Sequence, residues 1–596
     1  MIKSACPLDC YDGCGLYYLK DENRFKAIKD EPVNGTLCAH LYNQYLKEPR
    51  ILTPRIDGKE VSLEEALDEV AKVIDNKKWL LWRGSGHFGV MRYVTNILAK
   101  ELNGYITKGS LCDSAGEAGI KEGRGVNKTL PLDIIKNSEL IVVWGRNLSV
   151  TNSHILPYLN GKKVVVIDPI KTPIAKRASL HLQIKPRSDF YLAILLSRFI
   201  YMEQAQDEEW LEKFAPDWED FYEFTQTFRI KAILEHIGIS LDDLGDLLYL
   251  LQNHKTTFLV GVGPQKYSIG HYVLWAIDSL AATLGLFGKK DCGVAYLGNS
   301  LYGVDNIFNY KLPAVSHPLT PFRDFESIIV QGGNPAFSMP NSNRVKKELE
   351  EVENLIYFGL WENETSKLAR VVIPAKNFLE KRDLRFSYGH PYVEEMRKAL
   401  DFDGGVSEYE FTKEILKRFN KEELLRDEDF YINHFISFCK NIGDGRYIVK
   451  DYENIPYENG FGEDGDEEFI FIDEFYDDFE DNKHLKFVDY KKEDSTQDYY
   501  LITAKAKKSL NSQFERYEYI HLPPNSGFKD GESVVVESKW GFLIGKAKID
   551  DNLRDDCVLI YNSVNGVNRI TPNLVSQEGE CAIYQEVKVT LNKIKS

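Results

Sequence analysis

LIVVWGRN, residues 140–147, decides the fold class of this 596-residue chain. It is a short, uninterrupted apolar run that leads into a glycine, and similar runs recur between about residues 60 and 400. They are WLLWRGSG (79–86), KVVVIDP (163–169), TFLVGVG (257–263), SIIVQGGN (327–334), LIYFGLW (355–361) and RVVIPA (370–375). Continuous rather than alternating hydrophobicity is typical of strands buried on both faces, so an α/β fold with parallel sheets is predicted.

The stretches between these runs favour helices. VSLEEALDEVAKVIDN (61–76), for example, places its apolar residues on one face with a period of 3.6. In such folds, ligands bind at the carboxyl ends of the strands. The loops at these ends carry Gly145, Asp168, Gly261, Gly263, Gly332 and Gly333. None is a GxGxxG fingerprint, and GVGPQ (261–265) lacks the third glycine. The set of loops together indicates an extended ligand.

Four of the nine cysteines lie within the first 38 residues: Cys6, Cys10, Cys14 and Cys38. This spacing can place four thiolates around one centre, as an iron–sulfur cluster requires. Structural zinc is a rival, although it usually uses two short C-x2–4-C pairs. Disulfides would need an oxidising compartment, and MIKSACPLDC resembles no export signal. A [4Fe–4S] cluster and a cytoplasmic location are therefore expected.

The formal charge of −17 is concentrated in one place. Eleven of the 91 acidic residues lie between Glu463 and Asp481, and without them acidic residues would barely exceed the 74 lysines and arginines. This tract is expected to be a solvated linker or a docking surface for a basic partner, with interleaved aromatic residues that pack. Nucleic acid is a poor partner for this charge balance. No stretch approaches the roughly 18 apolar residues of a membrane span, so no direct membrane insertion is expected.

The pattern changes after the acidic tract. From Tyr499 the apolar runs become short and are separated by turns, as in YYLITAK, ESVVVESKWGFLIGKAKI, CVLIYNS and CAIYQEVKVTL. Such a series predicts a separate β-rich, barrel-like domain.

In order and spacing, these segments resemble the molybdopterin oxidoreductases of the dimethyl sulfoxide reductase family. CPLDCYDGCG with GTLC (35–38) is similar to the cluster segment of that family. Three segments are similar to the first dinucleotide-binding half of the family: VVWGRN (142–147), VIDPIKTPIAKRA (166–178) and PRSD (186–189). Two are similar to the second half: QGGNPAFSMP (331–340) and ENETSKLARVVIPA (362–375). TAKAKKSLNSQF (503–514) and VNRITPNLVSQEG (567–579) resemble the barrel that caps the pterins.

The resemblance implies a domain organisation. Residues 1–54 would form a [4Fe–4S] subdomain, and residues 55–425 two Rossmann-like parallel-sheet domains that bind dinucleotides. Residues 450–495 would be an acidic linker, and residues 497–596 a six-stranded-type β-barrel that also contacts the dinucleotides.

The resemblance also implies a bis(molybdopterin guanine dinucleotide) cofactor that holds molybdenum or tungsten. The positions that match cofactor-contacting positions are His40, Gly145, Asn147, Asp168, Asp189, Gly332, Asn334, Thr365, Ser509, Asn511 and Asn568. Asp168 and Asp189 would bind ribose hydroxyls and guanine N–H groups, respectively; helix capping or turn formation is the other explanation. His40 stands where the family often has a lysine or arginine between cluster and pterin, so its charge would depend on pH.

The segment TKGSLCDSAGEAG (107–119) occupies the place where the family presents a protein ligand to the metal. Cys112 is the candidate, because a thiolate is a soft ligand and a helix N-terminus lowers a thiol's pKa. Ser110 is the rival, and a buried free cysteine is the third explanation, as is assumed for the remaining cysteines: Cys292, Cys439, Cys557 and Cys581. Asp113, directly after Cys112, is the second candidate catalytic residue.

The implied activity is two-electron redox or oxo transfer on a small-molecule substrate, with electrons passing through one cluster. The partner would be a ferredoxin-like iron–sulfur protein or subunit. Formate dehydrogenases are similar in this loop, but they place a histidine where Asp113 follows Cys112. Two alternative functions are a non-redox reaction like that of a tungsten hydratase, since Asp9 and Asp12 flank Cys10, and a non-catalytic electron-transfer subunit of a respiratory complex. The retained Cys112 loop and dinucleotide motifs argue against the second.

Overall fold

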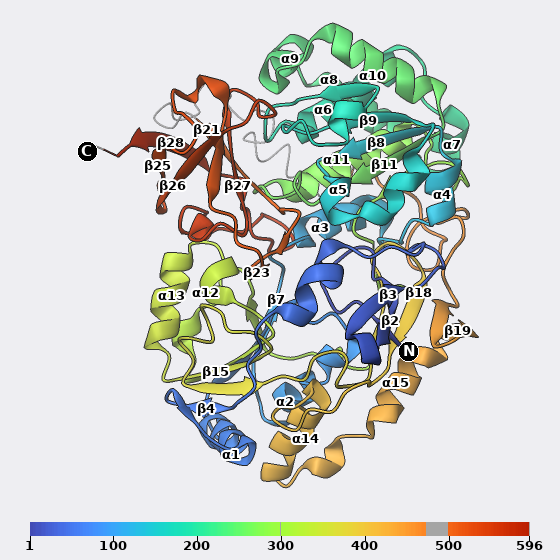
Figure 1. Cartoon of the computed structure of the whole chain (residues 1–596). Helices are drawn as coiled ribbons and strands as arrows, with labels where there is room; N and C mark the ends of the chain where they lie inside the picture. Colours follow the sequence, from blue (N-terminus) through green and yellow to red (C-terminus); the bar gives the residue numbers. More distant parts are fainter. Residues whose placement is uncertain (299, 473–498, 595–596) are drawn as a thin grey trace. The chain divides into compact units, whose positions relative to one another are not determined.

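The computed structural model describes residues 1–298, 300–472 and 499–594, and the chain divides into two compact units (Figure 1). Unit 1 comprises Met1–Gly109, Ser300–Tyr452 and Lys505–Tyr517. Unit 2 comprises Ser110–Asn299, Glu453–Ala504 and Glu518–Ser596. Each unit is therefore assembled from segments that are far apart in the sequence.

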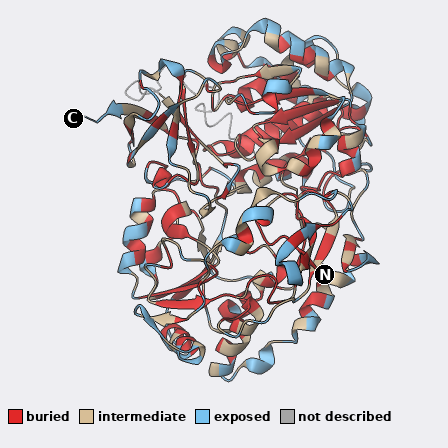
Figure 2. Cartoon of the chain, in the orientation of Figure 1, coloured by how far each residue is buried: buried red, intermediate tan, exposed pale blue. Residues whose placement is uncertain are grey.

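Unit 2 contains a five-stranded, entirely parallel sheet in the order β10-β9-β8-β11-β12. Its strands are β8 (Leu140–Trp144), β9 (Lys163–Ile167), β10 (Leu180–Leu182), β11 (Thr256–Val260) and β12 (Gly293–Ala295). Every residue of β8 and β11 is buried, which is why their sequences are apolar without alternation (Figure 2). The predicted parallel α/β architecture is confirmed.

The helices of unit 2 precede these strands or lie between them in the sequence. They are α3 (Ser114–Arg124), α4 (Leu132–Asn137), α5 (Leu148–Thr151), α6 (Asp189–Met202), α7 (Glu208–Phe214), α8 (Trp218–Gln226), α9 (Ile230–Ile237), α10 (Leu241–Asn253) and α11 (Gly270–Thr283). Helix α11 is buried along its whole length and packs on α3 and α6. Its nearly continuous apolar sequence follows from this central position.

The C-terminal part of unit 2 is a closed six-stranded barrel in the order β21-β27-β24-β26-β25-β28. The strands are β21 (Tyr499–Ala504), β24 (Tyr519–Leu522), β25 (Ser533–Ser538), β26 (Gly541–Ile549), β27 (Cys557–Tyr561) and β28 (Lys588–Lys593). The barrel joins the loop after β9 through a bridge between Ile170 and Leu553. Arg554 Nη1 also donates to the carbonyl of Gln183 at 2.6 Å. The predicted barrel is therefore confirmed.

Unit 1 contains a second, mixed sheet in the order β5-β4-β16-β15-β14-β6. Four strands are parallel, and a short hairpin adds antiparallel to β16. The strands are β4 (Arg55–Ile56), β5 (Lys59–Glu60), β6 (Trp79–Arg83), β14 (Ser327–Gln331), β15 (Asn354–Gly359) and β16 (Val371–Pro374). Helix α1 (Leu63–Ile74) packs on β16, and Ser62 and Glu65 form a capping box at its N-terminus.

Smaller elements complete unit 1. An antiparallel sheet near the N-terminus consists of β1 (Ile2–Ala5), β2 (Gly15–Leu19) and β3 (Arg24–Ala27). A four-stranded sheet consists of β17 (Asp383–Arg385), β18 (Tyr392–Met396), β20 (Arg446–Val449) and β19 (Cys439–Gly443). The remaining elements are β7 (Ile106–Lys108), β13 (Ala314–Ser316), β22 (Ser509–Leu510), β23 (Gln513–Phe514), α2 (Asn96–Glu101), α12 (Pro335–Ser338), α13 (Ser342–Glu351), α14 (Glu408–Arg418) and α15 (Glu428–Ser437).

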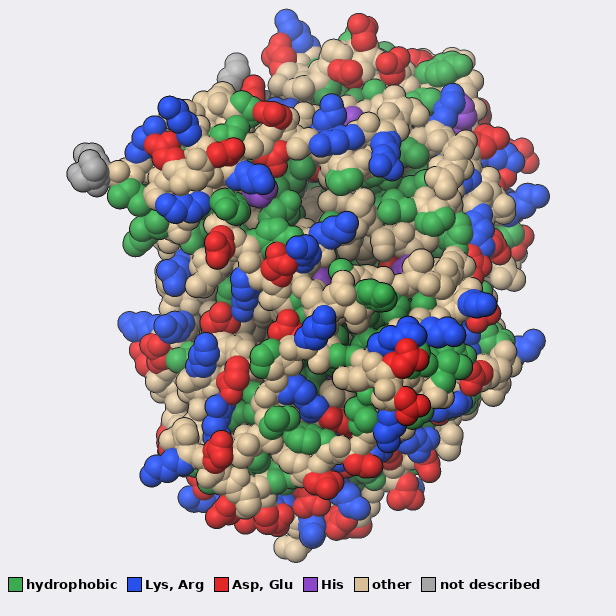
Figure 3. All heavy atoms as spheres, in the orientation of Figure 1, with side chains coloured by type: hydrophobic (Ala, Val, Ile, Leu, Met, Phe, Trp, Pro, Cys, Tyr) green, Lys and Arg blue, Asp and Glu red, His purple; other side chains and the backbone are tan. Residues whose placement is uncertain are grey.

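Part of the acidic tract packs in unit 2. Phe469 and Phe471 are completely buried, and Phe471 stacks on Phe221 at 4.6 Å between ring centroids. The tract beyond Ile472 lies outside the described residues. On the face drawn in Figure 3, acidic and basic side chains are interspersed. Within the described ranges, every helix is too short or too polar to cross a membrane.

Candidate functional site

The four N-terminal cysteines meet in unit 1, around the loop between β1 and β2. Cys6 N donates to Cys14 O at 2.8 Å, which closes this loop. Burial raises the pKa of the Cys6 thiol to about 12, and the neighbouring thiol of Cys38 adds to the effect. The pKa values of Cys10 and Cys14 are also raised, first by burial and then by Asp12 and the neighbouring thiols. The sequence-distant Cys38 thus lies with the other three.

Backbone N–H groups face these sulfur atoms. The N–H of Leu8 points to Cys6 and that of Asp12 to Cys10, and each lowers the pKa of its thiol. The N–H groups of His40 and Leu41 do the same for Cys38. Such donors stabilise thiolates and tune clusters. In the part of the chain that the structure describes, no three His, Cys, Asp or Glu side chains surround one point as ligands of a single metal ion would.

His40 follows the fourth cysteine in a short π-helical turn. Its ring stacks on Phe514, with centroids 4.9 Å apart, and its Nδ1 lies 2.8 Å from Gln44 Oε1. Burial lowers the pKa of His40. Burial therefore favours the neutral form of the His40 imidazole, whereas a lysine at this position would be positively charged.

In unit 1, the carboxyl ends of the parallel strands bring together two predicted cofactor residues. Asn334 Oδ1 accepts a hydrogen bond from Thr365 Oγ1 at 2.9 Å. Asn334 Nδ2 donates to Glu364 Oε2 at 2.7 Å, and Arg516 Nη2 lies 3.3 Å from the same oxygen. Arg516 thereby links the strand-end cluster to the segment after the β22–β23 hairpin. Sequence reasoning missed both Glu364, although it lies inside the quoted segment 362–375, and Arg516, which lies in no quoted motif.

Three more predicted cofactor residues of unit 1 are Asn511 and Ser509, in the β22–β23 hairpin, and Gly332. Asn511 has a φ of +52° in the hairpin turn, and Gly332 has a φ of +57° directly after β14. A positive φ is a conformation that glycine and asparagine tolerate. Ser509 is buried, and its Oγ has no hydrogen-bond partner among the described residues. That oxygen is available to a ligand group.

In unit 2, the end of β8 likewise carries a glycine with a positive φ and, two residues later, a buried side-chain oxygen. Gly145 has a φ of +57°, and a Cβ there would overlap the ring of Pro264. Asn147 precedes α5, and its buried Oδ1 has no hydrogen-bond partner within the described ranges. Asn568, in the loop after β27, is buried, and its Oδ1 lies 3.4 Å from Thr571 Oγ1.

Two buried carboxyl groups lie near each other in unit 2. Burial raises the pKa of Asp168 to about 7, and the charge of Asp189 contributes. Burial also raises the pKa of Asp189 to about 6, although Trp144 Nε1 donates to its Oδ1 at 2.7 Å. Asp168 Oδ1 accepts from the N–H of Ile170 at 2.8 Å, the turn role considered for it. Further N–H or O–H donors would stabilise both carboxylates.

The loop that carries Cys112 lies in unit 2, immediately before α3. Ser110 Oγ accepts from the N–H groups of Cys112 at 2.8 Å and Asp113 at 3.2 Å. The same hydroxyl donates to Asp113 Oδ1 at 2.7 Å. Ser110 therefore has the role of a cap for this turn, whereas Cys112 is half-buried and forms no disulfide.

Two residues of the loop after β11 fix the Cys112 loop. Gln265 Nε2 donates to the carbonyl of Cys112 at 2.7 Å, and its Oε1 accepts from the N–H of Gly116 at 2.9 Å. Lys266 Nζ donates to the carbonyl of Leu111. Sequence reasoning noted GVGPQ only as a failed dinucleotide fingerprint and so missed both side chains. Their position at a strand's carboxyl end was the available signal.

Comparison with known proteins places this geometry in a family. The family model for molybdopterin oxidoreductases matches residues 46–406. The chain is 29% identical over 475 residues to a probable oxidoreductase, YyaE, of Bacillus subtilis, covering 71% of this chain and 69% of the relative. It is 26% identical over 419 residues to the assimilatory nitrate reductase catalytic subunit of the same organism, covering 59% and 58%.

A solved structure has the same fold. Acetylene hydratase from Pelobacter acetylenicus matches with a TM-score of 0.78 at 14% identity, covering 100% of both chains. At this identity the likeness concerns the fold alone.

Proposed function

The chain belongs to the molybdopterin oxidoreductase family, and from that premise we propose that it carries out two-electron redox or oxo transfer on a small substrate. Electrons pass through one [4Fe–4S] cluster to or from a partner protein. Enzymes of this family use a pterin-bound molybdenum or tungsten, which supplies the electron and oxo chemistry when bound.

The gathering of Cys6, Cys10, Cys14 and Cys38 is the observation that carries the electron-transfer part. Thiols that raise one another's pKa are costly to ionise together unless a cation binds them. A cluster binds each thiolate to a different iron, so its four ligands need not converge on one point. The backbone N–H groups that face the sulfurs provide the hydrogen bonds that a cluster requires.

Each unit supplies one dinucleotide site of a bis(molybdopterin guanine dinucleotide) cofactor. In unit 2, Asp168 and Asp189 accept from hydroxyl and guanine N–H donors, and Gly145, Asn147 and Asn568 complete the site. In unit 1, Asn334 and Thr365 form the corresponding site with Gly332, Ser509 and Asn511. The partnerless oxygens of Asn147 and Ser509 support this proposal, because a buried polar atom without a partner destabilises the protein until a ligand binds it.

Cys112 is the protein ligand of the metal, and Asp113 lies beside it. This assignment is supported by the role of Ser110, whose hydroxyl is engaged with three backbone or side-chain groups of the same turn. Gln265 and Lys266 hold the loop by its carbonyls, which fixes the backbone that carries the thiol.

The residue after Cys112 argues against formate. Asp113 is an acid that would repel an anionic substrate if ionised. A hydratase reaction has one supporting feature, because Asp12 is buried beside the Cys10 and Cys14 thiols. Turnover of acetylene without an electron acceptor would favour this second function. The electron partner is a ferredoxin-like iron–sulfur protein or subunit.

Metal analysis of anaerobically purified protein tests the proposal directly. We expect molybdenum or tungsten together with about four irons per chain. Protein that contains zinc alone would refute it. Activity with reducible oxo-substrates and an artificial electron donor would then identify the substrate class.

A further inference from the structure

A completely buried arginine lies against the cysteine loop of unit 1. Arg385 is at the end of β17 and has 0% exposure. Among the residues that the structure describes, its guanidinium group donates only to backbone carbonyls: Nε to Cys6 at 3.1 Å, Nη2 to Leu8 at 3.2 Å and to Cys10 at 2.9 Å, and Nη1 to Phe386. Three of these four acceptors belong to the loop that carries the first two candidate cluster ligands.

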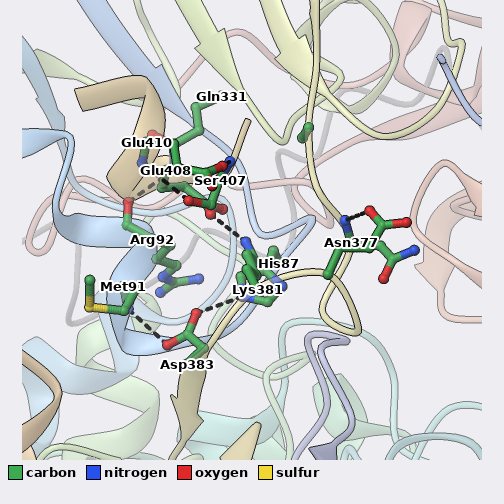
Figure 4. Close-up of polar contacts among 12 residues, drawn as sticks. His87, Met91, Arg92, Gln331, Asn377, Lys381, Asp383, Ser407, Glu408 and Glu410 are labelled. Carbon is green, nitrogen blue, oxygen red and sulfur yellow. Dashed lines mark hydrogen bonds and ion pairs between the residues drawn. The ribbon is translucent and has the colours of Figure 1, made fainter. Parts of the chain in front are cut away.

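Arg385 has no carboxylate partner within ion-pair distance among the residues that the structure describes. Asp383, two residues earlier on the same strand, is engaged by His87 Nε2 at 2.8 Å and by the N–H of Met91 at 3.0 Å (Figure 4). Glu408 is paired with Lys381. Asp383 and Glu408 are thus engaged by other groups, and the third buried carboxylate near the loop, Asp12, lies beside the thiols of Cys10 and Cys14.

Another arginine of the chain shows the usual arrangement. Arg124, in unit 2, is also 0% exposed, but its Nε donates to Asp278 Oδ2 at 2.7 Å and its Nη2 to Oδ1. Burying a charge without a counter-ion is strongly unfavourable. Arg385 instead faces the carbonyls of the cysteine loop, and its charge acts on the Cys6 thiol, whose pKa it lowers.

We propose that Arg385 is the internal counter-ion of the iron–sulfur cluster and positions the loop that binds it; this rests on the cluster of the proposed function. A cluster with four thiolate ligands is anionic and gains one more negative charge when it accepts one electron, without forming or breaking a bond to a proton. A fixed positive charge beside it stabilises the reduced form more than the oxidised form. Arg385 thus raises the reduction potential.

The positioning role follows from the directions of the loop's hydrogen bonds. Ser387 Oγ donates to the carbonyl of Tyr11 at 2.7 Å, and His390 Nε2 lies 2.6 Å from the carbonyl of Asp12. Together with Arg385, these side chains hold successive carbonyls of the loop toward the segment 385–390. The N–H groups of Leu8 and Asp12 then face the sulfurs, which is the orientation that cluster binding needs.

Two variants separate the charge from the hydrogen bonds. Arg385→Gln keeps hydrogen-bond donors but removes the charge, and Arg385→Lys keeps the charge but removes the planar fork. The matched control is Arg397→Gln, which removes a charge from a partly exposed arginine of the same unit that pairs with Glu395. The measurements are the midpoint potential, from a redox titration followed by electron paramagnetic resonance, and hydrogen exchange of the amides of residues 6–14.

We expect Arg385→Gln to lower the equilibrium constant of one-electron reduction at least tenfold, which is 59 mV toward more negative potential. Arg385→Lys should change it less than threefold and accelerate exchange in the 6–14 loop, and Arg397→Gln should leave both unchanged. The proposal is overturned if Arg385→Gln matches Arg397→Gln. If Arg385→Gln does not fold, Arg385→Lys provides the test, because lysine retains the charge. A tenfold decrease in its equilibrium constant of one-electron reduction would then overturn the counter-ion role.

Failure of the proposed function would be recognised separately. Wild-type protein that holds no iron and shows no signal on reduction would exclude the cluster itself before any variant is compared. If the wild-type protein holds the cluster but the Arg385→Gln variant has the same midpoint potential, only the counter-ion role is excluded.

Discussion

Replacing Gln265 by leucine should release the loop that carries Cys112. Gln265 is completely buried and joins the carbonyl of Cys112 to the N–H of Gly116 through its two amide atoms. Leucine has a similar volume but leaves both groups without these partners. Each buried group left unsatisfied costs about 1–3 kcal/mol, and half-burial of Cys112 allows water to compensate partly. We therefore expect a loss of about 2–4 kcal/mol in the free energy of unfolding.

The assay combines stability with metal content. A loss of about 3 kcal/mol corresponds to roughly 5 °C in the melting temperature of a cooperative unit of about 300 residues. Gln585→Leu is the matched control, because Gln585 is also buried in unit 2 and bridges the backbone of Thr503 with the same two amide atoms. Gln265→Leu should lose molybdenum or tungsten while it keeps iron, and Gln585→Leu should lose stability only. Equal metal content in the two variants would refute the reasoning.

Three further outcomes are expected. Cys112→Ala should abolish turnover and keep iron, and unchanged turnover would exclude Cys112 as the metal ligand. Ser110→Ala should keep the pterin-bound metal and lose about 1 kcal/mol of stability, because it removes the cap of the turn before α3. Because the folded pKa of Asp168 is about 7 against an ordinary value of 3.8, the folded cofactor-free protein retains a proton that the unfolded chain has released, so the free energy of unfolding falls as the pH rises from about 4 to 7. Asp168→Asn should remove up to about 2.7 kcal/mol of that fall between pH 5 and pH 8, measured by denaturant unfolding at these two pH values, and an unaltered slope would contradict the burial of this carboxyl group. Asp278→Asn should cost about 3–5 kcal/mol, because it leaves Arg124 buried without its counter-ion; a thermal shift below 1 °C would show that water reaches the pair.

Seven strands of the two large sheets could be predicted from the sequence because burial on both faces requires uninterrupted apolar runs: β6, β8, β9, β11, β14, β15 and β16. The short strands β4, β5, β10 and β12 have no such run and were not predicted. The capping box of α1 was equally local, since Ser62 and Glu65 are three residues apart. Arg385 and Gln265 could not be found in this way. Each acts on a loop more than 140 residues away in the chain, and a single arginine or glutamine in the sequence does not reveal which carbonyl it will meet.

The two candidate dinucleotide sites differ in a way that follows from their side chains. In unit 2 the strand ends present Asp168 and Asp189, whose raised pKa values make them partly protonated near neutral pH. In unit 1 the corresponding residues are an amide and a hydroxyl, Asn334 and Thr365, which do not titrate. A carboxylate accepts hydrogen bonds from N–H groups more strongly than a carboxylic acid does. Binding of a dinucleotide in unit 2 must therefore release protons and strengthen as the pH rises, while binding in unit 1 is insensitive to pH at these residues.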